Sequence, residues 1–232
     1  TIKKRKVNWE GRRIIEPSDV PFIITRSIVL CIDWANLLSD FYALSMSDRE
    51  ALLRARGTMV ALLMHGVNSY IRFGGDVMLM IDGSYFPRSQ KVQAQLPFAV
   101  NHFVNENITA SFDEVFAAMR EIAIDDGEIA VLRALALFMS TPLMSAEGRK
   151  RVEDTRIRYV DGLYAHIRQR RPELSERKVA MRIAKILLIL PLFKKVAYEE
   201  DIAIQSLAVC NVMEDLRGLP YELHTPDASA YQ

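Results

Sequence analysis

The segment of residues 47–73 constrains the fold more than any other part of the sequence. Apolar residues such as Leu52 and Leu63 recur around nearly the whole circumference of the helix that this segment predicts. Ser47 and Glu50, three residues apart, have the spacing of a capping box at its start. A helix that is apolar on all sides has to be covered on both faces, so we expect it at the centre of a layered domain.

Most of the remaining sequence also predicts helices. One stretch, residues 76–87, alternates between apolar and polar residues around the turn signal Asp82-Gly83 and predicts a single small hairpin. No repeat with a period of about 20 to 50 residues is found, which argues against a helical solenoid. The predicted fold is therefore all-α with one hairpin. Helical spacing of apolar residues covers 24–45, 112–124, 127–139, 149–170, 176–190 and 202–216, and residues 218–226 could form a last short helix.

The composition is that of an ordinary globular domain and excludes several classes of protein. The 232 residues carry a formal net charge of +1, so no global field attracts nucleic acid or membranes. The longest apolar run, residues 186–193, is far shorter than the ~20 residues that cross a bilayer. Cys31 and Cys210 stand alone in apolar stretches, which indicates neither a zinc site nor a disulfide framework.

Residues 1–17 form a basic segment ahead of the first periodic stretch. Lysines and arginines gather at residues 3–6 and 12–13. We interpret residues 1–17 as a flexible, solvated hinge or lead-in, or alternatively as a nuclear-localisation or DNA-proximal segment, and residues 18–232 as one domain. Because the sequence begins with Thr1 rather than Met, we expect it to be part of a longer protein.

Several segments resemble the ligand-binding domain of nuclear hormone receptors, and together they span about residues 18–226. Residues 119–138, MREIAIDDGEIAVLRALALF, resemble the family's seventh and eighth helices, and residues 182–193, RIAKILLILPLF, its tenth. Residues 82–88, DGSYFPR, look like the hairpin of the expanded nematode branch of the family. Residues 33–53, DWANLLSDFYALSMSDREALL, resemble the family signature, and the residues in register are Trp34, Ala35, Phe41, Leu44, Asp48, Leu52 and Leu53.

The resemblance implies a three-layer helical sandwich of about 10–12 helices with one small β-hairpin. It implies a transcription regulator of the nucleus that binds a lipophilic small molecule, forms homodimers or heterodimers, and recruits coactivator or corepressor peptides. DNA would be contacted only through a zinc-finger domain outside this sequence, and no membrane contact is expected. The alternative within the same family is a ligand-independent dimerisation and coregulator-binding scaffold with a filled pocket.

The resemblance places a ligand pocket between the predicted helices and the hairpin. The pocket residues are mostly apolar, which suits a fatty-acid-like or sterol-like ligand, and no cofactor is implied. Asn68 stands where many family members have an arginine that holds a ligand carboxylate, and Arg72, one turn later, is the alternative anchor. His65 either bonds a polar group of the ligand or is a structural histidine. The candidate ligand-binding residues are Ile23, Ile24, Ser27, Ile28, Cys31, Ala61, Leu62, His65, Asn68, Met78, Leu79, Ile108, Phe112, Ala203, Leu207 and Cys210.

The resemblance also implies a coregulator groove, where an amphipathic LxxLL helix binds between two helices and a mobile last helix. Family members hold the ends of this peptide with a charge clamp of one lysine and one glutamate. Asn36 occupies the lysine position and Tyr221 the glutamate position, so we predict weak LxxLL binding; Arg49 or Arg54 is the alternative positive end and the displaced Glu222 the negative one. The candidate groove residues are Ile32, Asn36, Met46, Arg49, Leu53, Arg54, Leu219, Tyr221, Glu222 and Leu223.

Two further features follow from the resemblance. A self-association surface is implied on residues 177–193, and cover by another helix of the same chain is the alternative. Glu128 and Arg182 match family positions on two helices that pack together, which predicts an internal ion pair with a structural role. The candidate dimer residues are Leu188, Ile189, Leu192 and Phe193.

The sequence indicates neither a catalytic site nor a metal site. It contains no GxSxG, HExxH or P-loop motif and no paired Cys/His cluster. The inward faces of the predicted helices are almost wholly apolar, which is a poor setting for acid–base chemistry. We therefore do not expect an enzyme.

Overall fold

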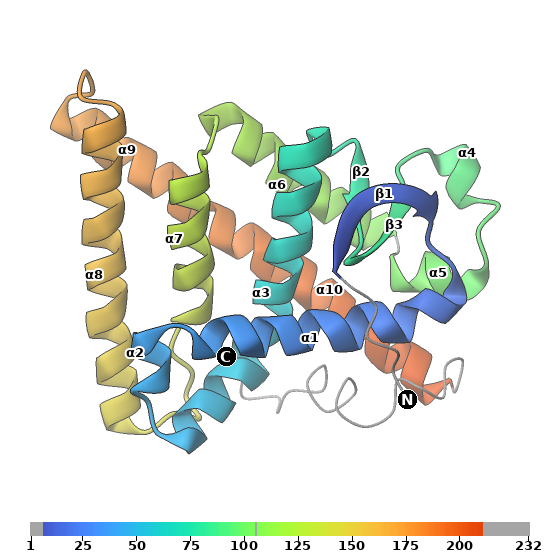
Figure 1. Cartoon of the computed structure of the whole chain (residues 1–232), viewed down its shortest axis with the longest axis horizontal. Helices are drawn as coiled ribbons and strands as arrows, with labels where there is room; N and C mark the ends of the chain where they lie inside the picture. Colours follow the sequence, from blue (N-terminus) through green and yellow to red (C-terminus); the bar gives the residue numbers. More distant parts are fainter. Residues whose placement is uncertain (1–6, 105, 211–232) are drawn as a thin grey trace.

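A computed structural model of the chain describes residues 7–104 and 106–210 (Figure 1). The fold is mainly helical, with one small sheet at one end of the molecule. The elements in chain order are β1 (Asn8–Ile14), a 3₁₀ turn (Pro17–Asp19), α1 (Val20–Asn36), α2 (Ser39–Tyr42), α3 (Met46–Phe73), β2 (Val77–Leu79), β3 (Asp82–Pro87), α4 (Gln90–Gln93), α5 (Phe98–Phe103), α6 (Glu106–Ile122), α7 (Asp126–Leu137), α8 (Ala146–Arg170), α9 (Glu176–Leu187) and α10 (Ile189–Val209).

The helices form three layers, and α3 lies in the middle one. In Figure 1, α1 crosses in front of α3, and α9 and α10 run diagonally behind α7 and α3. α1 packs on α3 from one side, α7 and α8 extend the middle layer, and α6, α9 and α10 cover the other side. Leu52 and Leu63 of α3 are fully buried, so the prediction of a central helix and the all-α layered fold are both confirmed. Among the described residues, no helix combines the length and the apolar character needed to cross a membrane.

The start of α3 differs from the predicted capping box. Ser45, not Ser47, is the N-cap, and its Oγ accepts a hydrogen bond from the backbone N–H of Asp48. The buried Asp48 carboxylate also accepts hydrogen bonds from the backbone N–H (2.7 Å) and the hydroxyl (2.9 Å) of Ser145, the N-cap of α8. A Cβ atom on Gly148 would come within 2.4 Å of this carboxylate. One signature residue therefore joins the first turns of two helices.

Several helix boundaries differ from the prediction. The helix expected over residues 24–45 ends at Asn36, and a short separate helix, α2, follows it. The helices expected at 176–190 and 202–216 are instead α9 and the continuous helix α10, which meet at Leu188. Pro191 lies in the first turn of α10, where its missing N–H has no helical acceptor to serve. The short helix predicted over 218–226 lies outside the described residues.

The predicted hairpin is confirmed, but the sheet contains a third strand that was not predicted. β2 and β3 pair antiparallel, and β1 pairs parallel with β3 on its other edge. Residues 8–14 are therefore not part of a solvated lead-in. Arg13 of β1 forms ion pairs with Asp19 (2.5 Å) and Asp82 (2.7 Å), whose carboxylates are almost completely buried. The hydrogen bond with Asp19 contributes most to raising the pKa of Arg13, so this strand is held by charge as well as by backbone pairing.

Candidate ligand cavity and partner surfaces

A largely apolar cavity lies where α1, α3, α5, α6 and α10 meet the sheet. Its volume is about 30 Å³, which is room for roughly two water molecules. The predicted residues that line it are Ile23, Ile24, Ser27, Ile28, Ala61, Leu62, His65, Met78 and Ile108. The structure therefore gathers residues from helices far apart in the sequence around one cavity, at the place that the resemblance implied.

The other predicted ligand residues do not line this cavity. Asn68 donates its side-chain amide to the carbonyl of Met64 in its own helix, and Cys210 is exposed at the end of α10. Cys31 lines a smaller recess between α1 and α3. The alternative anchor, Arg72, is exposed at the end of α3. The remaining ones are packed in the core away from the cavity: Leu79, Phe112, Ala203 and Leu207.

Some of the described residues that line the cavity were not predicted from the sequence. Thr58 lies three, four and seven residues before Ala61, Leu62 and His65, so helical spacing alone could have identified it. Met80 follows Met78 by two residues. Phe103 and Val104 belong to a segment that was not predicted to be helical, and Glu200 precedes the helix that was predicted over 202–216. The missed residues are Thr58, Met80, Phe103, Val104 and Glu200.

A hydrogen-bonded chain occupies one end of the cavity. His65 Nε2 lies 2.7 Å from Ser27 Oγ, and His65 Nδ1 lies 3.0 Å from the carbonyl oxygen of Leu79. The indole ring of Trp9 from β1 packs edge-on against the imidazole, with ring centroids 5.2 Å apart. Burial lowers the pKa of His65 to about 4, so the imidazole is neutral at physiological pH. Both ring nitrogens of His65 therefore have partners within the protein, which favours the role of a structural histidine over that of a direct ligand contact.

A second polar group lies at another part of the lining. The hydroxyl of Thr58 donates a hydrogen bond to the carboxylate of Asp201 (3.1 Å), which is 5 % exposed. Glu200, next to Asp201 on α10, also lines the cavity. No lysine or arginine is present among the described lining residues. The polar part of the lining thus combines hydroxyl groups, a neutral imidazole and a carboxylate.

The predicted coregulator groove is brought together only in part. Ile32 and Leu53 meet at a recess of about 10 Å³ between α1 and α3, beside Gly57 of α3. Asn36 is exposed at the last residue of α1, and Met46 is 74 % exposed at the first residue of α3.

The two alternative cations at this groove both have partners. The guanidinium of Arg49 lies over the ring of Tyr42, 5.2 Å from the centroid. Arg54 forms an ion pair with Glu50 on the same helix, with 3.0 Å between nitrogen and oxygen. The predicted residues of the last helix, Leu219, Tyr221, Glu222 and Leu223, lie outside the described residues.

The predicted dimer residues divide into two pairs. Leu188 is 67 % exposed and Leu192 is half-buried, so both reach the surface. Ile189 and Phe193 are fully buried, and the Phe193 ring meets Phe112 of α6 edge-on. The prediction that Ile189 and Phe193 form a dimer surface is wrong, because successive turns of α10 direct them into the core.

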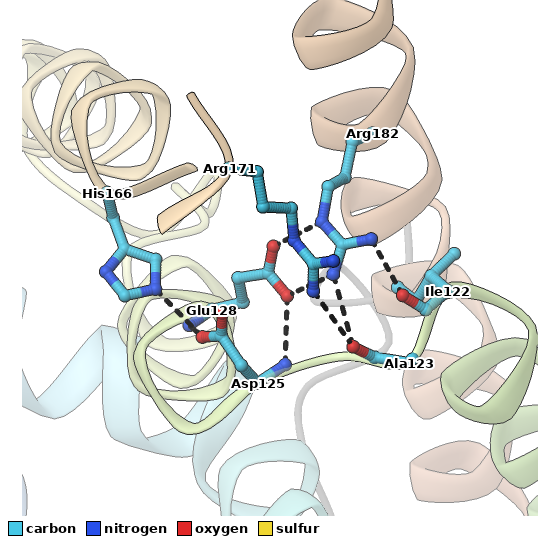
Figure 2. A network of polar contacts seen from close by, with 7 residues as sticks. All are labelled: Ile122, Ala123, Asp125, Glu128, His166, Arg171 and Arg182. Atoms are coloured by element: carbon cyan, nitrogen blue, oxygen red, sulfur yellow. Dashed lines mark hydrogen bonds and ion pairs between the residues drawn. The ribbon is translucent and has the colours of Figure 1, made fainter. Parts of the chain in front are cut away.

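The predicted ion pair between Glu128 and Arg182 is present and belongs to a larger network. The guanidinium of Arg182 of α9 donates two hydrogen bonds to the carboxylate of Glu128 of α7, of 2.5 and 2.7 Å (Figure 2). The same guanidinium donates to the carbonyl oxygens of Ile122 and Ala123 at the end of α6. Glu128 is completely buried, and its carboxylate accepts the backbone N–H of Asp125 in a capping box. One arginine in the middle of α9 therefore joins the end of α6 to the start of α7.

Comparison with known proteins agrees with this architecture. The family described as the ligand-binding domain of nuclear hormone receptor matches residues 7–205. Nuclear hormone receptor family member nhr-100 of Caenorhabditis elegans is 28 % identical over 231 residues, which cover 97 % of this chain and 52 % of that protein. Hepatocyte nuclear factor 4-gamma of Homo sapiens is 22 % identical over 81 % of this chain and 42 % of its own length.

The Transcription factor HNF-4 homolog of Drosophila melanogaster is 24 % identical over 84 % of the chain and 26 % of its own length. The chain spans about half the length of nhr-100 and 41 % of the length of nhr-4 of Caenorhabditis elegans, which is 21 % identical to it. The match to the family, the helical layers and the signature at Asp48 agree with one another. The chain therefore belongs to the ligand-binding domains of nuclear hormone receptors, a module of transcription factors.

Proposed function

We propose that the chain is the ligand-responsive module of a nuclear transcription regulator and binds a lipophilic small molecule in the cavity between α1 and α3. The observation that carries the proposal is the cavity lining, in which mainly apolar residues from five helices and the sheet converge. Burying an apolar ligand there would contribute about 25 cal/mol per Å² of apolar surface. Such a ligand would regulate the protein by binding one conformation of the module more tightly than another.

The ligand has to enlarge the cavity as it binds. Ligand pockets usually measure about 300 to 1,000 Å³, whereas this cavity measures about 30 Å³. Met78 and Met80 lie in its wall, and methionine side chains have three rotatable bonds with which to make room. The ligand therefore acts by pushing side chains of the sheet apart, which couples its binding to the packing of β2 and β3 on α3.

Purified protein should carry or accept such a ligand. We expect native mass spectrometry and organic extraction to recover a co-purified lipid, or a lipophilic probe to raise the melting temperature by about 5 to 10 °C at 100 times its Kd. The probe set is a sterol, a fatty acid and a fatty alcohol. Ala61→Val narrows the cavity and should remove most of this shift. Ala55→Val adds the same volume to the same helix outside the cavity and should leave it unchanged.

The second candidate function is a ligand-independent dimerisation and coregulator-binding scaffold. The small volume of the cavity favours this function, because side chains that already pack closely against one another need no ligand to fill the space between them. Protein without extractable lipid, together with no thermal shift for any probe, would establish this reading and exclude the first. In either case the apolar face around Leu188 and Met181, which is 52 % exposed, is the proposed dimer contact, and DNA would be contacted by a domain outside this chain.

Coregulator binding should be weak and should respond to one charge. Asn36 ends α1, four residues after Ile32 of the recess, and lacks the positive charge that caps the C-terminus of a bound LxxLL helix. Asn36→Lys should tighten the binding of an LxxLL peptide about two- to fivefold, since a cation at a helix end contributes roughly 0.3 to 1 kcal/mol. Fluorescence polarisation measures this affinity.

Gln169→Lys is the control for this experiment, because it adds the same charge at an exposed position near the far end of α8 (Figure 1). It should leave the peptide affinity unchanged. A sub-micromolar Kd for the unmodified chain would show that the interpretation of Asn36 is wrong. Equal tightening by the two lysines would show that net charge, not the cap, controls binding.

A further inference from the structure

The polar groups of the ligand cavity allow its preferred ligand class to be inferred, provided that the cavity binds a ligand as proposed. Two polar corners interrupt the apolar lining. The first contains Ser27 of α1 and His65 of α3, and the second contains Thr58 of α3 and Glu200 of α10. What each corner offers a ligand depends on where its hydrogens already point.

At the first corner every hydrogen is already used within the protein. The carbonyl oxygen of Leu79 can only accept, so His65 Nδ1, 3.0 Å away, must carry a proton. The imidazole is neutral, because burial lowers its pKa to about 4, and its Nε2 is therefore an acceptor. Ser27 has one hydroxyl hydrogen and two acceptors at 2.7 Å, His65 Nε2 and the carbonyl of Ile23. Whichever of them takes the hydrogen, Ser27 has only lone pairs left for a ligand.

The first corner is also held rigidly, so its hydrogens cannot easily be redirected. Ser69 of α3 donates its hydroxyl to the carbonyl of His65 (2.8 Å) and accepts the backbone N–H of Leu79 (2.8 Å). Leu79 is thereby fixed to α3 through both its N–H and its carbonyl group. Trp9 covers the imidazole from the side of β1. The imidazole can turn toward a ligand only by giving up its hydrogen bond to the carbonyl of Leu79, one of the two bonds that fix β2 to α3.

The second corner adds a carboxylate to the lining, that of Glu200. The Thr58 hydroxyl donates its hydrogen to the Asp201 carboxylate. A ligand carboxylate would bring only acceptors and a negative charge to this wall. Because no lysine or arginine is found among the described lining residues, the desolvation of that charge would not be offset. A ligand hydroxyl or N–H group, in contrast, matches the lone pairs of Ser27 at the first corner.

We infer that the cavity selects lipophilic ligands that carry a hydrogen-bond donor, such as an alcohol or an amine, and discriminates against carboxylates. Ser27 Oγ, at the first corner, is the acceptor for this donor. Of the two ligand classes that the sequence suggested, the sterol-like class satisfies this rule through its hydroxyl group, and the fatty-acid-like class does not. Selectivity would follow from the direction of hydrogen bonds and not from the size of the cavity.

Three probes with the same alkyl character test the inference: octan-1-ol, heptyl methyl ether and octanoate at pH 7.5. Ligand-observed NMR or calorimetry gives their dissociation constants with the whole chain. The alcohol should bind about fivefold more tightly than the ether, which lacks the donor, and at least about tenfold more tightly than octanoate. Octanoate binding as tightly as octan-1-ol would overturn the inference while leaving the proposed lipophilic site intact. If none of the three binds, the proposed site itself fails.

Two serine variants locate the acceptor. Ser27→Ala should bring the affinities of the alcohol and the ether close to one another, because it removes the lone pairs that receive the ligand's hydroxyl. Ser111→Ala also removes a buried hydroxyl, but from α6 and outside the cavity lining, so it should keep the alcohol preference. The ratio of two affinities does not depend on how stable each variant is. An unchanged ratio in Ser27→Ala would exclude Ser27 as the acceptor.

Discussion

Replacing Glu128 with alanine should lower the free energy of unfolding by about 3 to 5 kcal/mol. Glu128 is completely buried, and the Arg182 side chain that it pairs with is only 12 % exposed. Without the carboxylate, the guanidinium keeps its hydrogen bonds to the carbonyls of Ile122 and Ala123 but loses its counter-charge in a site that water hardly reaches. The backbone N–H of Asp125 loses its acceptor as well. The penalty therefore comes from what is left unpaired.

Chemical denaturation or calorimetry measures this loss, which corresponds to a fall of about 6 to 20 °C in the melting temperature of a domain of this size. Glu121→Ala is the matched control. Glu121 also pairs with α9, through Lys185 at 2.6 Å, but both side chains are at least half exposed. Solvent screens such a pair, so its removal should leave the melting temperature within error. Equal effects of the two variants would contradict a buried, structural role for Glu128.

The parts of the fold that could be predicted are those that local spacing records. The all-round apolar character of residues 47–73 identified the central helix, and alternation around Gly83 identified the β2–β3 hairpin. β1 was missed because its partner, β3, lies about 70 residues further along the chain. The arginines of β1 suggested a solvated segment. Arg13 instead pairs with the buried carboxylates of Asp19 and Asp82, and this burial exists only in the folded chain.

The junction of α9 and α10 shows a second limit. Helical spacing of apolar residues continues across Leu188, and a proline three residues later suggested the end of a helix. In the structure Pro191 is near the start of a new helix instead, and both positions are compatible with the chemistry of proline. Whether Pro191 ends one helix or begins the next depends on how α10 packs against α6 and α3, and the local sequence does not determine this packing.

The cavity was predictable as far as its apolar wall is concerned. Ile24, Ser27 and Ile28 share one face of α1, and the resemblance directed that face inward. Glu200 could not be recognised, because its register depends on α10 being continuous from Ile189. The hydrogen-bond directions at His65 depend on Leu79, which belongs to another element, so they too required the structure.

Replacing Phe193 with alanine should destabilise the folded monomer by about 3 to 5 kcal/mol. Its ring is fully buried, meets Phe112 of α6 at a centroid distance of 6.3 Å, and fills the space beside Gly66 of α3. A Cβ atom at Gly66 would already lie 3.1 Å from the Phe193 ring, so three helices pack closely at this point. Alanine would leave a cavity where they cross, and rigid helices close such a cavity only in part.

This substitution separates a core role from an interface role when it is compared with Leu188→Ala. Leu188 is largely exposed at the neighbouring turn, so its loss should leave the unfolding midpoint of dilute protein unchanged and should weaken any dimer in sedimentation analysis. Phe193→Ala should lower the midpoint at every protein concentration, because its contacts lie within one chain. If Phe193→Ala instead dissociated a dimer and kept the stability of the monomer, its ring would have to face a partner. That result would show that Phe193 of α10 does not pack against α3 and α6, and it would contradict the described contact between these three helices.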